Sequence, residues 1–98
     1  MYINEQKLTK IKEKALKENI PIIMDDTLEL LGKILKVKKA KNILEIGTAI
    51  GYSAICFAEY LEDNGKIDTI EREEERILEA EKNINEFGLK NNIQIFKR

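Results

Sequence analysis

Apolar residues in the first third of the chain recur at the spacing of two amphipathic helices. The first helix is predicted over residues 5–18, and its stripe at i, i+3 and i+7 consists of Leu8, Ile11 and Ala15. Pro21 ends this pattern and predicts an extended segment over residues 20–24, because the residue before a proline avoids the helical region. A second helix is predicted over residues 26–37, and its buried stripe consists of Leu28, Leu31 and Leu35.

From residue 42 onward the period changes, and short apolar runs alternate with longer helical patterns. Strands are predicted over residues 42–47, 66–71 and 93–96. The first of them is apolar enough to be a strand that is buried on both faces. Helices are predicted from residue 52 to about 61 and from residue 73 to about 87. The Gly-Leu pair that follows is typical of a Schellman stop.

The element order is therefore α-α-β-α-β-α-β, and the fold class is α/β. Strands that alternate with helices pair in parallel through right-handed crossovers, and in a doubly wound sheet this gives the spatial strand order 3-2-1. We expect a single, incomplete domain. Residues 1–41 would form the N-terminal helices and a loop on the ligand side, and residues 42–98 the first half of a nucleotide-binding unit.

The composition excludes several kinds of site. The 98 residues include no histidine and one cysteine, so they offer no internal disulfide, no Cys/His zinc site and no Ser-His or Cys-His nucleophile pair. There is no stretch of about 20 uncharged apolar residues, so no transmembrane helix is predicted. The first ten residues lack the apolar core of a signal peptide. We therefore expect a cytoplasmic protein without a membrane partner, in which Cys56 is a small core residue.

Charge is unevenly spread, although the net charge is only −1. Residues 1–41 contain ten lysines and six acids (10 − 6 = +4), and residues 42–98 contain seven basic residues and twelve acids (7 − 12 = −5). Four lysines share one face of the first predicted helix: Lys7, Lys10, Lys14 and Lys17. This face could contact RNA phosphates or be an ordinary solvated surface. The second interpretation is favoured, because Glu13 and Glu18 partly neutralise the face.

The segment most informative about function is EIGTAIGYS, residues 45–53, where the first predicted strand leads into a helix. Gly47 and Gly51 permit a ligand to approach the backbone closely, and the start of the helix offers free N–H donors. Glu71 ends the second predicted strand, where a carboxylate can accept ribose hydroxyls. The pattern favours a nucleotide-like ligand over the alternative of a simple tight turn with a surface acid nearby. The Gly-x-x-x-Gly spacing differs from that of dinucleotide sites and disfavours a dehydrogenase.

The sequence ILEIGTAIGYSA, residues 43–54, resembles the first motif of S-adenosylmethionine-dependent O-methyltransferases of the catechol, caffeoyl-CoA and bacterial tRNA 5-hydroxyuridine type. The segments Pro21–Met24 and Ile70–Arg72 are also similar to that family, and the likeness runs from about residue 20 to the end of the chain. The resemblance implies the N-terminal half of a Rossmann-like class I methyltransferase fold, with S-adenosylmethionine as its cofactor.

By this resemblance, six residues are assigned to the cofactor: Ile22, Met24, Glu45, Gly47, Ser53 and Glu71. Glu45 and Gly47 would line the methionine end, and Ser53 would contact the methionine carboxylate. The acid that ends the second strand would hold the ribose, and the two residues of the preceding loop would border the methionine portion. A carboxylate at position 45 also suits the cationic sulfonium and amine of the cofactor.

Members of this family usually bind a divalent metal such as Mg²⁺ through Asp and Asn residues that follow the third strand, and the metal positions and acidifies the substrate hydroxyl. The sequence reaches Arg98 before such positions, so no metal ligand and no catalytic residue is assigned. The expected function is the cofactor-binding part of an O-methyltransferase acting on an aromatic hydroxyl or on 5-hydroxyuridine in tRNA. The alternative is a truncated, non-catalytic half-domain that binds an adenosyl ligand weakly or assembles with another chain. An unpaired edge on the first strand predicts a homo-oligomer or another strand-edge association.

Overall fold

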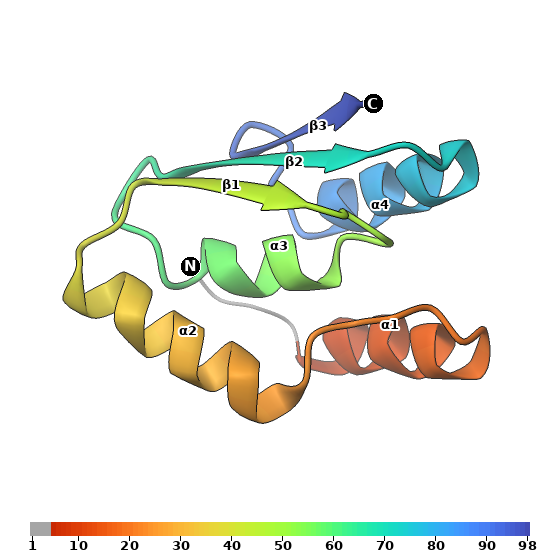
Figure 1. Ribbon diagram of the computed structural model, residues 1–98, viewed down its shortest axis with the longest axis horizontal. Coiled ribbons are helices and arrows are strands. Elements are labelled where there is room, and N and C mark those ends of the chain that lie inside the picture. Colours follow the sequence, from red (N-terminus) through yellow and green to blue (C-terminus); the bar gives the residue numbers. More distant parts are fainter. Residues whose placement is uncertain (1–4) are drawn as a thin grey trace.

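The computed structural model describes residues 5–98, and within them the predicted element order is confirmed (Figure 1). The elements are α1 (Glu5–Lys17), α2 (Asp25–Val37), β1 (Asn42–Ile46), α3 (Tyr52–Ala58), β2 (Lys66–Glu71), α4 (Glu74–Glu86) and β3 (Ile93–Lys97). The three strands form one parallel sheet with β2 in the centre, as the predicted order 3-2-1 requires. The Rossmann-like α/β fold class is therefore confirmed.

The helix α3 is shorter than the sequence predicts, because it ends at Ala58 instead of continuing to about residue 61. Beyond it, the N–H of Glu62 bonds to the carbonyl of Ala40 at 3.0 Å, so the chain leaves the helix to join the loop before β1. The Tyr60 ring packs against Gly32 of α2, where a Cβ atom would lie only 2.5 Å from the ring. These tertiary contacts end the helix before its apolar pattern ends.

One face of the sheet, called the bare face, is covered by none of the helices in residues 5–98 (Figure 1). Figure 1 shows all four helices on the same side of the strands. Successive right-handed crossovers that advance in one direction across a sheet place their helices on one face. The prediction that the first strand is buried on both faces is therefore wrong for this structure, where Leu44 is 67% exposed and Ile46 is 74% exposed.

The core lies between the sheet and the helices. It includes Ile11 and Ala15 of α1, Ile55 of α3 and Ile67 of β2 in one cluster. The α4 helix ends in the predicted Schellman motif, in which the N–H of Leu89 bonds to the Ile84 carbonyl at 3.0 Å. This core fixes the carboxyl ends of β1 and β2 relative to α3.

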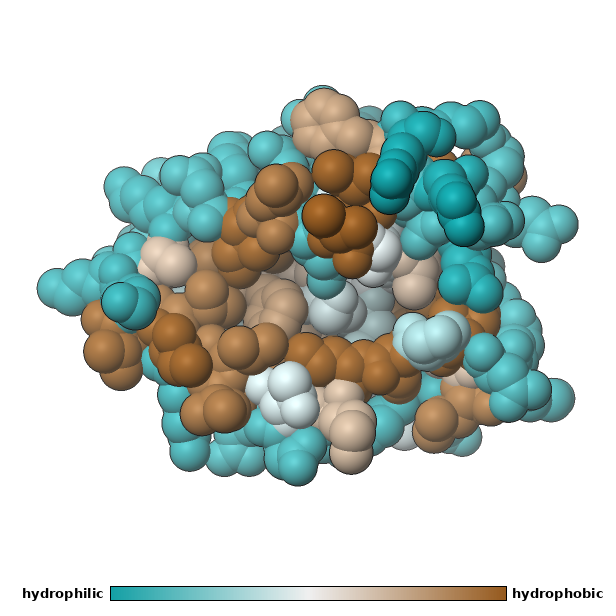
Figure 2. Space-filling model, viewed as in Figure 1, coloured by the Kyte–Doolittle hydropathy of each residue, from teal (hydrophilic) through white to brown (hydrophobic). Residues whose placement is uncertain are grey.

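A large apolar surface remains exposed. Figure 2 shows hydrophobic residues gathered across the middle of the view, with hydrophilic residues around the rim. The exposed large apolar side chains of α2 and β1 are Leu30, Leu31, Ile34, Val37, Leu44 and Ile46. Among residues 5–98, no helix has the length and apolar character needed to cross a membrane.

Candidate functional site at the carboxyl ends of β1 and β2

A cavity of about 270 Å³ opens at the carboxyl end of β1. Four of the six residues predicted to bind the cofactor line it: Ile22, Glu45, Gly47 and Ser53. The segment before α2 contributes one wall, and the turn between β1 and α3 contributes the floor. The rest of the lining is Pro21, Ile23, Leu31, Thr48, Ala49, Tyr52 and Phe57. The cavity therefore combines an apolar wall with a carboxylate and hydroxyl groups.

The turn after β1 depends on glycine at position 47. Gly47 has φ +92°, a conformation that side chains disfavour, and a Cβ built there would meet no atom within 4 Å. The backbone at this point therefore faces open space. The N–H groups of Gly47 and Thr48 both bond to the carbonyl of Ile70, at 2.8 and 3.2 Å, so the turn is fixed to the end of β2.

Hydroxyl groups hold the carboxylate of Glu45 in place. Ser53 donates a hydrogen bond to Oε2, and Thr69 donates one to Oε1 at 2.7 Å. Burial raises the pKa of Glu45, and the hydrogen bonds from Ser53 and Thr69 oppose that rise. The two hydroxyls thus favour the anionic form of a carboxylate that faces the cavity.

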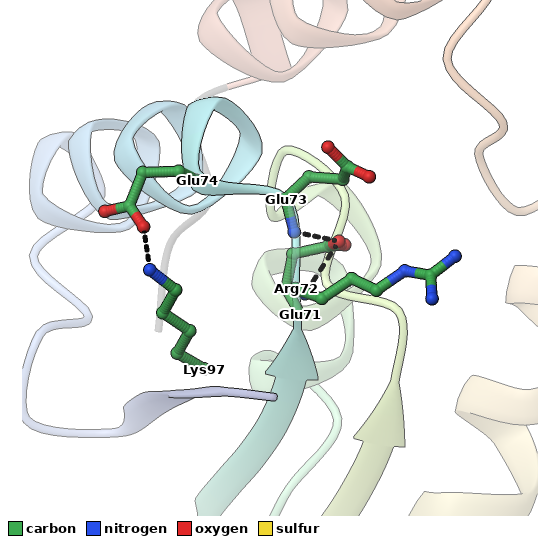
Figure 3. Close-up of polar contacts among 5 residues, drawn as sticks. All are labelled: Glu71, Arg72, Glu73, Glu74 and Lys97. Atoms are coloured by element: carbon green, nitrogen blue, oxygen red, sulfur yellow. Dashed lines mark hydrogen bonds and ion pairs between the residues drawn. The ribbon is translucent and has the colours of Figure 1, made fainter.

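Glu71 caps the turn that follows β2. Its Oε2 accepts hydrogen bonds from the N–H groups of Arg72 at 3.0 Å and Glu73 at 3.1 Å, while the side chains of both these residues extend away (Figure 3). Its Oε1 accepts a third, from Ala49, at 2.9 Å. Burial alone would raise the pKa of Glu71, but these backbone donors and the charge of Arg76 outweigh it and hold the pKa below its ordinary value.

The two other predicted residues lie outside the cavity lining. Glu71 is separated from the cavity by Ala49, to which it is hydrogen-bonded. Met24 immediately precedes α2 and is 69% exposed, so its side chain is directed to the surface. Their assignment to the cofactor stays a prediction, as does that of the four cavity residues.

Tyr52 and Cys56 are buried side by side in α3. Burial raises the pKa of Tyr52 to about 12 and that of Cys56 to about 12. Both groups therefore keep their protons near neutral pH. A protonated thiol is a weak nucleophile, so Cys56 behaves as the core residue that the sequence suggests.

Sequence reasoning missed the two threonines of the site. Thr48 and Thr69 are 1% and 0% exposed, and their hydroxyl oxygens lie 2.7 Å apart. Threonine is common in strands, so Thr69 gives no signal on its own. The alignment of β1 with β2 supplies the signal, because it places Thr69 directly opposite Glu45.

Lys7, Lys10 and Lys14 line the groove between α1 and α4. Lys14 forms an ion pair with Glu79 at 2.9 Å, and the Nζ of Lys7 donates to the carbonyl of Glu86 at 3.3 Å. Two of the four predicted lysines are thus bonded to α4, which favours the interpretation of this face as an ordinary solvated surface.

The described residues do not fit a divalent metal. Within residues 5–98 there is no group of three or more Asp, Glu, Cys or His side chains that could hold a metal ion.

The fold and the site define a class: a Rossmann-like unit whose first strand leads through a glycine turn to an acidic, hydroxyl-lined cavity. A family model described as O-methyltransferase matches residues 2–98. Catechol O-methyltransferase of Niastella koreensis is 43% identical over 68 residues, which make up 69% of this chain and 29% of that protein. The chain belongs to the O-methyltransferase family.

Two solved structures of O-methyltransferases superpose on this chain. The O-methyltransferase from Bacillus cereus in complex with SAH (S-adenosylhomocysteine) superposes with a TM-score of 0.84 at 26% identity, over 99% of this chain and 45% of that one. The O-methyltransferase TomG from Streptomyces achromogenes, in complex with SAM (S-adenosylmethionine), gives 0.81 at 27% identity, over 97% of this chain and 44% of that one. The chain thus spans less than half the length of these relatives.

Proposed function

We propose that this chain binds S-adenosylmethionine at the carboxyl end of β1 and forms the cofactor-binding part of an enzyme that methylates a hydroxyl group. The observation that carries the proposal is the convergence of Glu45, Gly47 and Ser53 on one cavity. The SAH and SAM bound to the relatives from B. cereus and S. achromogenes support it.

The chemical groups of the site suit this cofactor. Glu45 offers a carboxylate to the cationic methionine end. The single hydroxyl proton of Ser53 is donated to Glu45 in the structure, so Ser53 would bind the methionine carboxylate by turning this proton toward it. Three of about four acceptor positions on Glu71 are occupied by backbone N–H groups, which leaves one for a ribose hydroxyl. Ile22 supplies apolar contact from the loop before α2, with Met24 beside it at the surface. When bound, the cofactor would supply an electrophilic methyl group on its sulfonium.

The methyl acceptor that we propose is a hydroxyl of an aromatic small molecule, because the catechol O-methyltransferase of N. koreensis is a relative. A second candidate is 5-hydroxyuridine in tRNA, which the four lysines on α1 would suit. A divalent metal such as Mg²⁺ belongs to this proposal only for a longer polypeptide, since residues 5–98 do not fit it. A cytoplasmic location is also part of the proposal, and the free, buried thiol of Cys56 supports it.

Calorimetric titration of the chain with S-adenosylhomocysteine tests the proposed function. Saturable binding with one site is expected, and 5′-methylthioadenosine should bind more weakly, because it lacks the amine and carboxylate that Glu45 and Ser53 would contact. Absence of binding by both ligands would overturn the cofactor assignment. Radiolabelled methyl transfer to catechol and to a tRNA that carries 5-hydroxyuridine distinguishes the acceptors. Binding without any turnover would favour the alternative of a non-catalytic half-domain.

A further inference from the structure

The side chains of Glu45 and Thr69 meet across two neighbouring strands. Glu45 of β1 pairs in register with Thr69 of β2, and the Thr69 hydroxyl lies 2.7 Å from Oε1 of Glu45. Thr69 is completely buried. Its hydroxyl also lies 2.7 Å from that of Thr48, which is buried in the turn after β1. The two threonines thus form a continuous hydrogen-bonded path that ends on Glu45.

The chemistry of these groups fixes the direction of the path. An ionised carboxylate can only accept hydrogen bonds, and a threonine hydroxyl has one proton to donate. Since Thr69 gives its proton to Glu45, Thr48 must donate to Thr69. With Ser53 donating to Oε2, each oxygen of the carboxylate is held by one hydroxyl from a different element.

The strand itself does not need this hydroxyl. Valine has almost the same shape as threonine, favours strands and is preferred at fully buried positions. A hydroxyl buried without a partner is unfavourable, and here both threonines have partners. The hydroxyl at position 69 therefore serves the group that it contacts.

We propose that Thr69, supported by Thr48, is a positioning residue that holds the Glu45 carboxylate in the orientation and the ionised form needed to bind the methionine end of the cofactor. This inference rests on the proposed function. It adds a residue on β2 to the set that recognises the cofactor through β1 and the turn after it. The hydroxyl is the part of Thr69 that matters, and serine should replace it.

Thr69→Val and Thr69→Ser, each compared with the parent chain, test this role. Thr69→Val should weaken binding of S-adenosylhomocysteine by roughly tenfold near neutral pH, as expected for loss of one hydrogen bond to a charged group. It should leave 5′-methylthioadenosine binding within about twofold, because that ligand lacks the methionine portion that Glu45 would contact. Thr69→Ser should restore most of the lost affinity. As the pH is lowered, the affinity for S-adenosylhomocysteine should begin to fall at a higher pH in the valine variant than in the parent chain.

A carboxyl-carbon NMR titration of Glu45 separates this inference from the function on which it rests. The pKa of Glu45 should rise in Thr69→Val and return toward the parent value in Thr69→Ser, whether or not the chain binds the cofactor. An unchanged pKa in the valine variant overturns the positioning role. Equal losses of affinity in the valine and serine variants also overturn it, since they indicate packing alone. If circular dichroism shows that Thr69→Val is unfolded, Thr48→Val takes its place. This variant should raise the pKa of Glu45 by a smaller amount. No rise would overturn the role of the path from Thr48 through Thr69 to Glu45.

Discussion

Oε1 of Glu71 accepts a hydrogen bond from the N–H of Ala49 at 2.9 Å, and this contact joins the end of β2 to the turn after β1. The same carboxylate accepts hydrogen bonds from two further N–H groups in the turn between β2 and α4. Glu71 is therefore a structural link between the turns that follow β1 and β2. Its predicted contact with a ribose adds to this role, so affinity and stability must be measured separately.

Replacement of Glu71 by alanine should weaken binding of S-adenosylhomocysteine by about 1.5–3 kcal/mol, the value of one hydrogen bond to a charged group. It should also lower the free energy of unfolding, because three backbone N–H groups lose their partner. Calorimetry and urea denaturation measure the two effects. Glu73→Ala is the matched control, since its side chain is exposed and points away from Glu71 (Figure 3). An affinity for Glu71→Ala within twofold of the parent would remove Glu71 from the site.

Stability should depend on pH through Glu71. Its pKa is held below the ordinary value of 4.5, so the folded state binds a proton less readily than the unfolded state. The stabilisation is present above pH 4.5 and is lost as the pH falls through the lower pKa of the folded state. Urea denaturation of the parent and of Glu71→Gln across this range should show a smaller loss in the variant. Identical pH profiles for the two proteins would contradict the capping role.

Substitution of Gly47 tests whether the cofactor approaches the backbone closely at this residue. Alanine at this position should cost about 1–2 kcal/mol of stability, because φ is +92°, and should also abolish cofactor binding, because the new methyl group enters the open space at the cavity. Gly88→Ala is the control: φ is +69°, a Cβ there also meets no atom within 4 Å, and the residue lies beyond α4, away from the cavity. Thermal unfolding should shift similarly in both variants, while calorimetry should detect lost binding only for Gly47→Ala. Binding retained by Gly47→Ala would mean that this glycine serves the turn alone.

Much of the fold follows from the sequence, and the exceptions have physical causes. The alternation of strand and helix periods predicts the parallel sheet and its order, because right-handed crossovers leave few other arrangements. The exposure of Leu44 could not be predicted, since it depends on α1 and α2 lying on the same face of the sheet as α3 and α4 (Figure 1), which the crossover rule does not determine. The turn after β1 and Glu45 were recognisable from a local motif. Thr69 was not, because its contact with Glu45 depends on the register of strands that are separated in the sequence.

We expect the lysine face of α1 to be a solvated surface that makes no contact with tRNA. Exchange of Lys7, Lys10, Lys14 and Lys17 for glutamine should leave the slope of log affinity for tRNA against log salt unchanged, because a phosphate contact is what makes that slope steep. The bonds of Lys7 and Lys14 to α4 favour this outcome. A flatter slope in the quadruple variant would instead support tRNA as the methyl acceptor.

The bare face of the sheet leads to a prediction about association. Among the residues that the structure describes, β1 is hydrogen-bonded to a strand on one side only, and its side chains Leu44 and Ile46 are largely exposed on the face opposite the helices. An apolar edge strand with free N–H and C=O groups recruits further strands. Removal of this surface from water favours association by about 25 cal/mol per Å² of apolar area. We therefore expect the 98-residue chain to self-associate at micromolar concentration.

Two lysines placed on this face should oppose that association. The double variant Leu44→Lys and Ile46→Lys puts positive charge where two copies would meet, so sedimentation velocity should show a shift toward the monomer. Leu16→Lys is the control, because Leu16 is also 62% exposed but lies on α1, away from the sheet. It should leave the association of the parent unchanged. A parent chain that sediments as a monomer at every concentration would show that the edge of β1 is protected without a partner. An equal reduction of association by Leu16→Lys and by the double variant would indicate general apolar attraction instead of the strand edge.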